Sequence, residues 1–296
     1  FQLNVKPIDG LTITPGIRYS WFDRNVNAAV NIKTGLPQIY DNTYHSWLPS
    51  IEARYQFSPH LSGYAQVAKG FLAPNENFFT RNNPNIVTFA PETTTNYQAG
   101  LAMQTRRLSL SFDGYIINFS NYIQLQGSGN NAYYNNLGGV TYKGLEAEGT
   151  LALGAGFSLY ANGSVNSAMT QASASNPTSS WVANAPKTTA AGGLIYDHDG
   201  IYASFLTKFI GPRYGSDGEE LGSFSTTDLS LGFDLKHWMP GVPAKVKLNI
   251  NNIFNNTSII NDNGTTVGNN PATGNPDNLY WTNPGRSVFA TIEFKM

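Results

Sequence analysis

Strand-like segments of about ten residues alternate in this chain with connections that are by turns very short and very long. One face of residues 11–21 carries Leu11, Ile13, Ile17, Tyr19 and Trp21. The other face carries Thr12, Thr14, Arg18 and Ser20. A period of two means that the two faces of a strand meet different surroundings. Tight turns at one end and long loops at the other are typical of a membrane β-barrel, whose short turns face the periplasm.

The connections follow a regular order along the chain. All of the short ones except Thr105–Arg107 carry Gly, Pro, Asp or Ser, which tolerate or pre-set turn dihedral angles. They are Asp9–Gly10, Ser58–His60, Thr105–Arg107, Gly154–Gly156, Asp197–Gly200 and a longer corner at Pro240–Pro243. The long ones, rich in Asn, Gly, Pro, Ser and Thr, lie near residues 25–45, 73–91, 127–137, 173–186, 213–222 and 257–280. This order predicts six hairpins and a final strand, thirteen strands in all.

Many charged side chains, such as Arg18, Glu146 and Asp228, fall on the polar face of these segments. Residues 227–235, for example, place Leu229, Leu231, Phe233 and Leu235 on the apolar face. A charge facing lipid at mid-bilayer costs roughly 2–4 kcal/mol. The polar face is therefore predicted to line a lumen that is wet or filled by other protein. The lumen- or plug-contacting candidates are Arg18, Glu146, Glu148, Asp228, Asp234 and Lys247.

Composition excludes several classes of protein. Only 12% of the 296 residues are charged, with a net charge of −1, so no nucleic-acid partner is expected. The absence of Cys excludes disulfides, thiolate metal sites and a Cys nucleophile. No window approaches 18 consecutive apolar residues, so no helical membrane span is expected. A mean hydropathy of −0.27 is compatible with a barrel, because only alternate strand residues meet lipid.

The start of the sequence and the strand count both indicate a longer protein. The chain begins at Phe1 in a strand-like segment, without the export signal that an outer-membrane protein needs. An open sheet in lipid leaves edge N–H and C=O groups unsatisfied, and bacterial barrels close with an even number of strands. We therefore expect residues 1–296 to form the C-terminal part of a barrel, with an odd number of strands upstream.

Several motifs resemble those of one family, in the family's order. WLPSIEARYQFSPHLSGYAQVAKGFLAPN (47–75) resembles a hairpin of TonB-dependent outer-membrane receptors. FAPETTTNYQAGLAM (89–103) and the Asn136 to Glu148 stretch are similar to two of its later strand starts. Ala185-Pro186-Lys187, LNINNIFN (248–255) and the Tyr280 to Arg286 stretch resemble three more. The ending Phe294-Lys295-Met296 departs from the terminal aromatic usual in the family.

This resemblance implies a plugged barrel of about twenty-two strands, of which this chain supplies the last thirteen. It also implies a receptor that imports a scarce ligand, most simply a ferric siderophore or other iron chelate. The partners would be that ligand, outer-membrane lipid and the TonB complex. The plug domain, TonB box and signal peptide are absent from this sequence. No cofactor, resident metal or enzymatic activity is expected.

Aromatic and Arg residues in the predicted outer loops are the ligand-binding candidates. An Arg fork suits the oxygens of an anionic chelate, and aromatic faces suit its organic scaffold. The candidates are Tyr44, Phe78, Phe79, Arg81, Tyr133, Tyr134, Trp181, Arg213, Tyr214 and Tyr280. Trp21, Trp47 and Trp238 are interpreted instead as the aromatic girdle of the membrane interface.

Other clusters have plainer explanations. Glu146 and Glu148 have no His nearby in sequence, and we expect them to pair with cations of the plug or lumen. The oxygen-rich loop stretches 217–220 and 261–264 lack the EF-hand pattern that would bind calcium. The four His residues are dispersed, and only His45 lies toward the outer side.

Three alternatives to an iron-chelate importer remain open from the sequence. The same architecture also suits cobalamin or an oligosaccharide. A passive porin would need an open lumen without a plug. A barrel enzyme would need an acid–base constellation at one height, for which His45 is the outer-side histidine.

Overall fold

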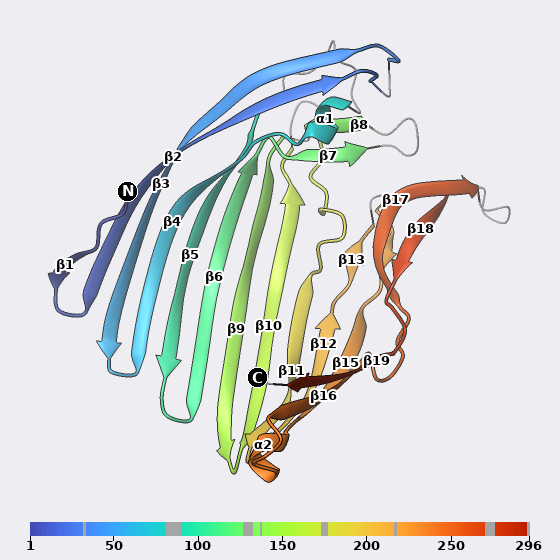
Figure 1. The fold of residues 1–296 in the computed structure, drawn as a ribbon. Coiled ribbons are helices and arrows are strands. Elements are labelled where there is room, and N and C mark those ends of the chain that lie inside the picture. The colour runs from blue at the N-terminus through green and yellow to red at the C-terminus, as the bar shows by residue number, and fades with distance from the viewer. Residues whose placement is uncertain are drawn as a thin grey trace.

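The chain folds into one large antiparallel sheet that curves like the wall of a barrel (Figure 1). The computed structural model describes residues 1–31, 34–80, 90–126, 133–136, 138–172, 177–215, 218–269 and 276–294. Within these residues the sheet has thirteen strands in the order β1-β2-β3-β4-β5-β6-β9-β10-β11-β12-β15-β16-β19. The predicted strand count is therefore confirmed. No helix in the described ranges is long and apolar enough to cross a membrane.

The strands of the sheet are long, and β2 and β3 are the longest at 18 and 21 residues. The first seven in the sheet are β1 (Val5–Ile8), β2 (Leu11–Ala28), β3 (Gln38–Ser58), β4 (Leu61–Leu72), β5 (Glu92–Gln104), β6 (Leu108–Ser120) and β9 (Val140–Gly154). The other six are β10 (Phe157–Thr170), β11 (Thr188–His198), β12 (Ile201–Ile210), β15 (Phe224–Asp234), β16 (Ala244–Asn251) and β19 (Ser287–Phe294).

The short connections lie at one end of the sheet, where they were predicted (Figure 1). The turn after β9 needs left-handed backbone, and Gly154, Ala155 and Gly156 all have positive φ. The connection before Pro240–Pro243 differs from the expectation, because a short helix, α2 (Leu235–Trp238), follows β15 there. Asp234 caps this helix by accepting a hydrogen bond from the Lys236 backbone N–H. Leu235 therefore belongs to a helix and does not continue the apolar strand face.

The long connections lie at the opposite end and contain more regular structure than predicted (Figure 1). The 25–45 loop is shorter than expected, because β2 and β3 extend well into it. The other elements there are α1 (Glu76–Thr80), β7 (Ile123–Gln126), β8 (Tyr133–Asn136), β13 (Arg213–Tyr214), β14 (Glu220–Leu221), β17 (Ile259–Asn269) and β18 (Pro276–Thr282). Backbone pairing continues into these hairpins because it satisfies loop N–H and C=O groups.

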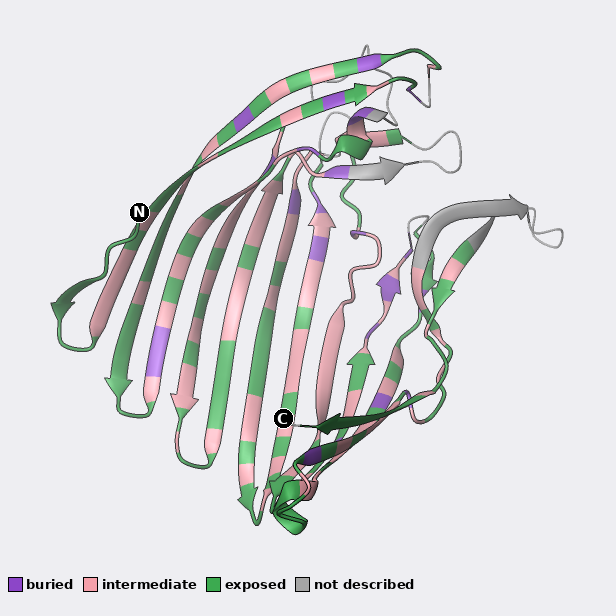
Figure 2. Cartoon of the chain, viewed as in Figure 1, coloured by how far each residue is buried: buried purple, intermediate pink, exposed green. Residues whose placement is uncertain are grey.

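The strand register separates apolar and polar side chains onto opposite faces. On β15, Leu229 pairs with Phe205 and Ile250, all on the apolar face. Asp234 alternates to the other face, where it is 3.5 Å from Lys245. The alternation predicted for 227–234 is thus present. Figure 2 shows exposed and half-buried residues succeeding one another along the strands.

The polar face carries hydrogen bonds that reach across strands. The Tyr115 hydroxyl of β6 donates to Asn166 Oδ1 of β10 at 2.9 Å, crossing β9. Gly144 of β9 lies beneath this bridge, and a Cβ there would approach the Tyr115 oxygen to 2.8 Å. The loop elements α1 and β7 pack on the same face of β2 through Val26. The polar face is therefore the lumenal side of the wall, and the apolar face is the lipid-facing side.

Two of the family-like motifs meet at the loop ends of β16 and β19. Asn252, in a left-handed conformation (φ 50°), donates from its amide to the carbonyls of Asn256 and Pro284, each at 2.8 Å. Asn255 Oδ1 accepts the Arg286 backbone N–H at 2.8 Å. Left-handed backbone suits Asn, and its amide donates and accepts at once. The Asn-rich motif therefore fixes the direction in which the chain leaves the wall.

Candidate functional site

The outer limit of the membrane-spanning wall is marked by tryptophans. Trp21 and Trp47 are 65% and 61% exposed on the lipid-facing side. The Tyr19 ring lies 4.7 Å from that of Trp47. The stretch from Leu11 to Trp21 has the length of a transmembrane strand, about 9–11 residues, and interfacial aromatics close such spans. The parts of β2 and β3 beyond these tryptophans project outside the membrane.

The projecting parts of β2 and β3 are covered on their lumenal side by the outer loops. Phe79 of α1 is 1% exposed, and its ring stacks 4.1 Å from Tyr40 of β3. Phe79 packs in one cluster with Val26 of β2 and Ile123 of β7. Beside it, the Phe78 and Tyr134 rings are 4.5 Å apart. The structure thus brings together three of the predicted ligand candidates, Phe78, Phe79 and Tyr134.

A cavity of about 440 Å³ opens beside this aromatic cluster. Its walls come from the outer ends of β2, β4 and β5 and from the loops that follow β4 and β6. Aromatic side chains and asparagine amides both face it. The lining residues that matter here are Phe22, Arg24, Asn75, Asn77, Phe78, Glu92 and Tyr134.

Arg24 is the cation of this cavity. Its Nε is buried and has no hydrogen-bond partner among the described residues. Its guanidinium carbon lies 4.6 Å from the centre of the Phe22 ring, in a cation–π arrangement. Glu92 lines the same cavity but makes no ion pair with Arg24 in the described part of the chain. Arg24 therefore keeps donor capacity for an anionic or oxygen-rich guest.

Glu92, the first residue of β5, has a structural partner instead. Its Oε1 accepts the Ile123 backbone N–H at 2.7 Å, which ties β7 to the wall. Burial raises the pKa of the Glu92 carboxyl, and the bond from Ile123 opposes that rise. The carboxyl can therefore be neutral at a higher pH than a free glutamate, which reduces its repulsion of an anion.

Tyr44, predicted in a loop, is instead part of β3 and points to the lumenal side. It is 5% exposed, and its hydroxyl is hydrogen-bonded to that of Tyr40. Asn42 donates its amide to the Tyr40 oxygen at 3.2 Å. Burial, followed by the bond to Tyr40, raises the pKa of Tyr44 to about 12. Its phenol therefore stays protonated, and Tyr44 supports the wall beside Arg24.

A second cluster joins Trp181 and Tyr214 around a lysine that the sequence did not single out. Lys187 Nζ donates to the Tyr214 hydroxyl at 2.9 Å and lies 4.4 Å from the centre of its ring. The Trp181 indole donates to the Ala185 carbonyl at 2.7 Å. The bond to Tyr214 raises the pKa of Lys187. This side of the mouth therefore also carries a fixed positive charge among aromatic rings.

Arg213 has a different setting from Arg24. It is 1% exposed, and its three nitrogens donate to the carbonyls of Ile260, Gly222 and Ile259 at 3.1, 3.0 and 2.7 Å. These bonds tie the β13–β14 hairpin to β17. A ligand would have to displace three carbonyl oxygens to reach this guanidinium, so the geometry gives Arg213 a structural role.

The remaining loop candidates are dispersed. The Tyr280 hydroxyl donates to the Glu219 carboxylate, which links β18 to the β13–β14 hairpin. Tyr133, at the start of β8, is 46% exposed. Arg81 and Asp217 lie outside the described residues. His45 pairs in register with Trp21 on the lipid-facing side, away from the cavity.

The register places all six lumen candidates on the lumenal side of the wall. Asp228 accepts the Asn252 backbone N–H at 2.8 Å, and Lys247 pairs with Glu293 at 2.9 Å. Glu146 and Glu148 are exposed on β9 and share a polar recess with Asp113. Neither forms an ion pair with a cation of the described ranges. Their charges are therefore open to the lumen.

Sequence reasoning missed Arg24 because it ended the strand near Trp21. The signal was present, since Arg24 continues the period of two that places Arg18 on the lumenal side. Lys187 was noted only as part of a motif.

Comparison with known proteins supports the same architecture. A family described as TonB dependent receptor-like, beta-barrel matches residues 1–253. Three solved structures align with nearly all of the chain. The ferric yersiniabactin uptake receptor FyuA from Yersinia pestis has a TM-score of 0.72 and 17% identity over 98% of this chain and 44% of its own.

The copper transporter OprC gives a TM-score of 0.74 and 16% identity, over 99% of this chain and 48% of its own. The ferric citrate transporter FecA gives a TM-score of 0.73 and 17% identity, over 96% of this chain and 42% of its own. The chain thus spans less than half the length of these proteins. At such low sequence identities, the structural similarity establishes the fold alone. The family match covers most of the chain, and the chain belongs to the TonB-dependent receptor-like β-barrel family of the bacterial outer membrane.

Proposed function

We propose that this chain is part of a receptor that captures a scarce anionic ligand at its outer mouth and imports it by TonB-dependent transport. The cavity at Arg24 is the proposed capture site, and the ligand class we favour is a ferric siderophore or another iron chelate. The observation that carries the proposal is the Arg24 guanidinium, which stacks on Phe22 and has a buried, unpartnered Nε beside the cavity.

The chemistry of the cavity supports this ligand class. The planar guanidinium presents donors to carboxylate, hydroxamate or catecholate oxygens. The rings of Phe78 and Tyr134 offer flat apolar surface for an organic scaffold. Lys187 adds a second fixed cation at the mouth. Both charges also raise the local concentration of an anionic chelate before it binds.

The lumen would be filled by a plug domain carried on another part of the protein. Support comes from the open carboxylates Glu146 and Glu148, which basic plug residues would neutralise. The sheet edges β1 and β19 each pair with one described strand, so further strands are needed to satisfy their backbone groups in lipid. With these parts, ligand capture outside would couple to TonB inside. Such a protein is a transporter and not an enzyme.

The test uses the full-length receptor and a panel of ferric chelates, cobalamin and oligosaccharides. Arg24→Gln should weaken binding of the preferred ferric chelate about tenfold or more, because a hydrogen bond to a charged group contributes roughly 1.5–3 kcal/mol. Arg54→Gln is the matched control. Arg54 of β3 lies on the same lumenal side of the wall as Arg24 of β2, but toward the turn end. Preference for cobalamin or sugar, or unchanged chelate affinity in Arg24→Gln, would contradict the proposal.

A further inference from the structure

Two grooves lie end to end on the lipid-facing side of the wall, away from the cavity at Arg24. The groove nearer the outer loops has a volume of about 790 Å³ and crosses β4, β5, β6, β9 and β10. The second, about 550 Å³, continues it toward the short turns over the same strands. They adjoin because Ala99 lines the first, and Leu101, the next β5 residue on that face, lines the second.

Small side chains form the floor of both grooves. In the first, Ala65, Ala99 and Gly114 lie in one row across β4, β5 and β6. Larger side chains such as Tyr97 and Leu145 stand beside them. In the second, the small residues are Ala147, Gly149, Ala161 and Gly163. A furrow of this kind accepts extended hydrocarbon chains.

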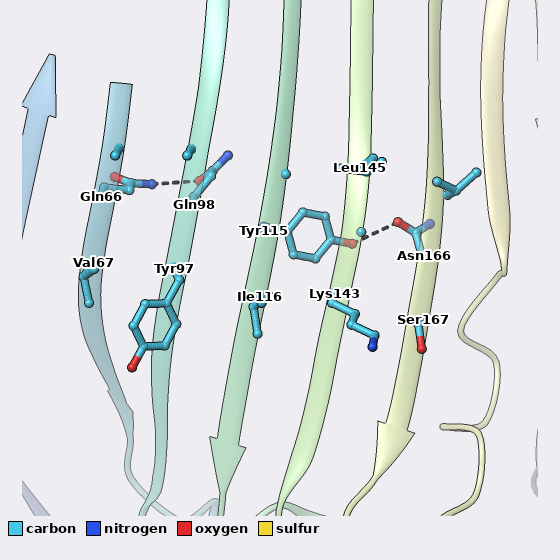
Figure 3. A pocket seen from close by; sticks show the side chains of 15 residues that line it. Gln66, Val67, Tyr97, Gln98, Tyr115, Ile116, Lys143, Leu145, Asn166 and Ser167 are labelled. Atoms are coloured by element: carbon cyan, nitrogen blue, oxygen red, sulfur yellow. Dashed lines mark hydrogen bonds between the residues drawn. The ribbon is translucent and has the colours of Figure 1, made fainter. Parts of the chain in front are cut away.

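A lysine stands at the outer end of the furrow. Lys143 lies in the row of Val67, Tyr97, Ile116 and Ser167, and Figure 3 shows it between Ile116 and Ser167. Lys69 occupies the next lipid-facing row, still closer to the outer loops. Both are exposed, and neither has a hydrogen-bond or ion-pair partner among the described residues.

These lysines mark the polar boundary of the lipid-facing side. From Lys69 the row continues with Thr95, Asn118 and Thr141, whereas the rows below Lys143 are apolar. A lysine on a lipid-facing strand extends its ammonium to the interface, where each basic residue near an anionic surface contributes about 1 kcal/mol. The charge therefore complements a phosphate whose acyl chains occupy the furrow.

We propose that the furrow and Lys143 form a binding site for the phosphorylated glycolipid of the outer leaflet. The acyl chains lie along the floor of small residues, and a glucosamine phosphate accepts hydrogen bonds from the Lys143 ammonium. The placement decides between leaflets, because Lys143 is at the loop end of the wall, where the outer leaflet of an outer membrane has its head groups. Lys69 adds positive charge at the same level.

The experiment measures lipid retention by the full-length receptor with native mass spectrometry in detergent. The probes are lipid A with two phosphates, dephosphorylated lipid A, phosphatidylglycerol and phosphatidylcholine. Lipid A should bind most tightly. Lys143→Gln should weaken it about fivefold, the factor that corresponds to about 1 kcal/mol. The charge-matched control is Lys236→Gln, because Lys236 lies on α2 at the turn end and should leave lipid A binding unchanged.

A second variant tests the furrow without touching the charge. Ala99→Leu fills the floor and should weaken lipid A and dephosphorylated lipid A alike. Ala290→Leu, on the lipid-facing side of β19, is its control and should bind as the unaltered receptor does. Equal binding of lipid A to Lys143→Gln and the unaltered receptor would overturn the proposal. So would phosphatidylglycerol binding as tightly as lipid A, because the site would then read any anionic head group.

Discussion

Two arginines at the outer mouth of the barrel have opposite environments. Arg213 is enclosed, and three backbone carbonyls accept its hydrogen bonds. Arg24 lies against Phe22 with a buried Nε that no described group accepts. Both are loop-end arginines that lie over a phenylalanine ring, Phe22 for Arg24 and Phe224 for Arg213, so residue type alone does not separate them. The difference shows that tertiary contacts decide whether an arginine holds the loops together or remains available to a ligand.

The largest expected effect comes from truncating Phe79, the aromatic side chain packed beside the Arg24 cavity. Phe79→Ala leaves a cavity among Val26, Tyr40 and Ile123 and should destabilise the local packing by about 3–5 kcal/mol. Hydrogen exchange should then increase in β7 and at the outer ends of β2 and β3. The β13–β14 hairpin around Arg213 should be unaffected. A uniform increase across both regions would show that the two sides are not independent.

The second effect tests the structural role of Arg213. Arg213→Met keeps the apolar stem but leaves three carbonyls without their donor, which should cost about 2–3 kcal/mol of local stability. The readout is proteolysis and hydrogen exchange of the β13–β14 hairpin and of residues 259–260. Ligand affinity at the Arg24 cavity should stay within about twofold. A large loss of affinity with intact loops would instead make Arg213 a ligand contact.

A smaller effect is expected from Arg24→Lys, which keeps the charge but loses the planar fork. Chelate affinity should fall by about 1 kcal/mol, roughly fivefold, and less than in Arg24→Gln. The thermal stability of the barrel should not change, because Arg24 lies beyond the Trp21 boundary. Calorimetric titration with the preferred chelate measures the affinity of each variant. Equal losses of affinity in Arg24→Lys and Arg24→Gln would mean that the positive charge by itself does not recognise the ligand.

The smallest effect concerns pH. Burial raises the pKa of Glu92 above its value in the unfolded chain, so the folded state binds more protons between the two pKa values. The stability contributed by this group is present below the unfolded pKa and is lost as the pH rises through the folded pKa. The protection of the β7 amides against hydrogen exchange, measured relative to the intrinsic exchange rate at each pH, should therefore fall modestly across that window. Glu92→Gln should flatten this dependence, and an unchanged profile would assign it to another group.

The amino-acid sequence by itself determined the wall. The period of two fixes which side of each strand meets lipid, and a single-residue slip would place charges such as Asp228 in the bilayer. The short turns follow from residues that tolerate left-handed backbone, as at Gly154 to Gly156. These signals are local, so thirteen strands and their faces can be read directly from the chain.

Only the tertiary structure decided the mouth and the lipid-facing furrow. Arg24 and Phe78 are more than fifty residues apart in sequence, and their cavity exists because α1 and β7 fold over β2. Gly114 of β6 and Lys143 of β9 line the same groove only because their strands pair. No local sequence pattern indicates that backbone carbonyls accept hydrogen bonds from Arg213 and that none among the described residues accepts one from the Arg24 Nε. The loops that decide this come from distant parts of the chain.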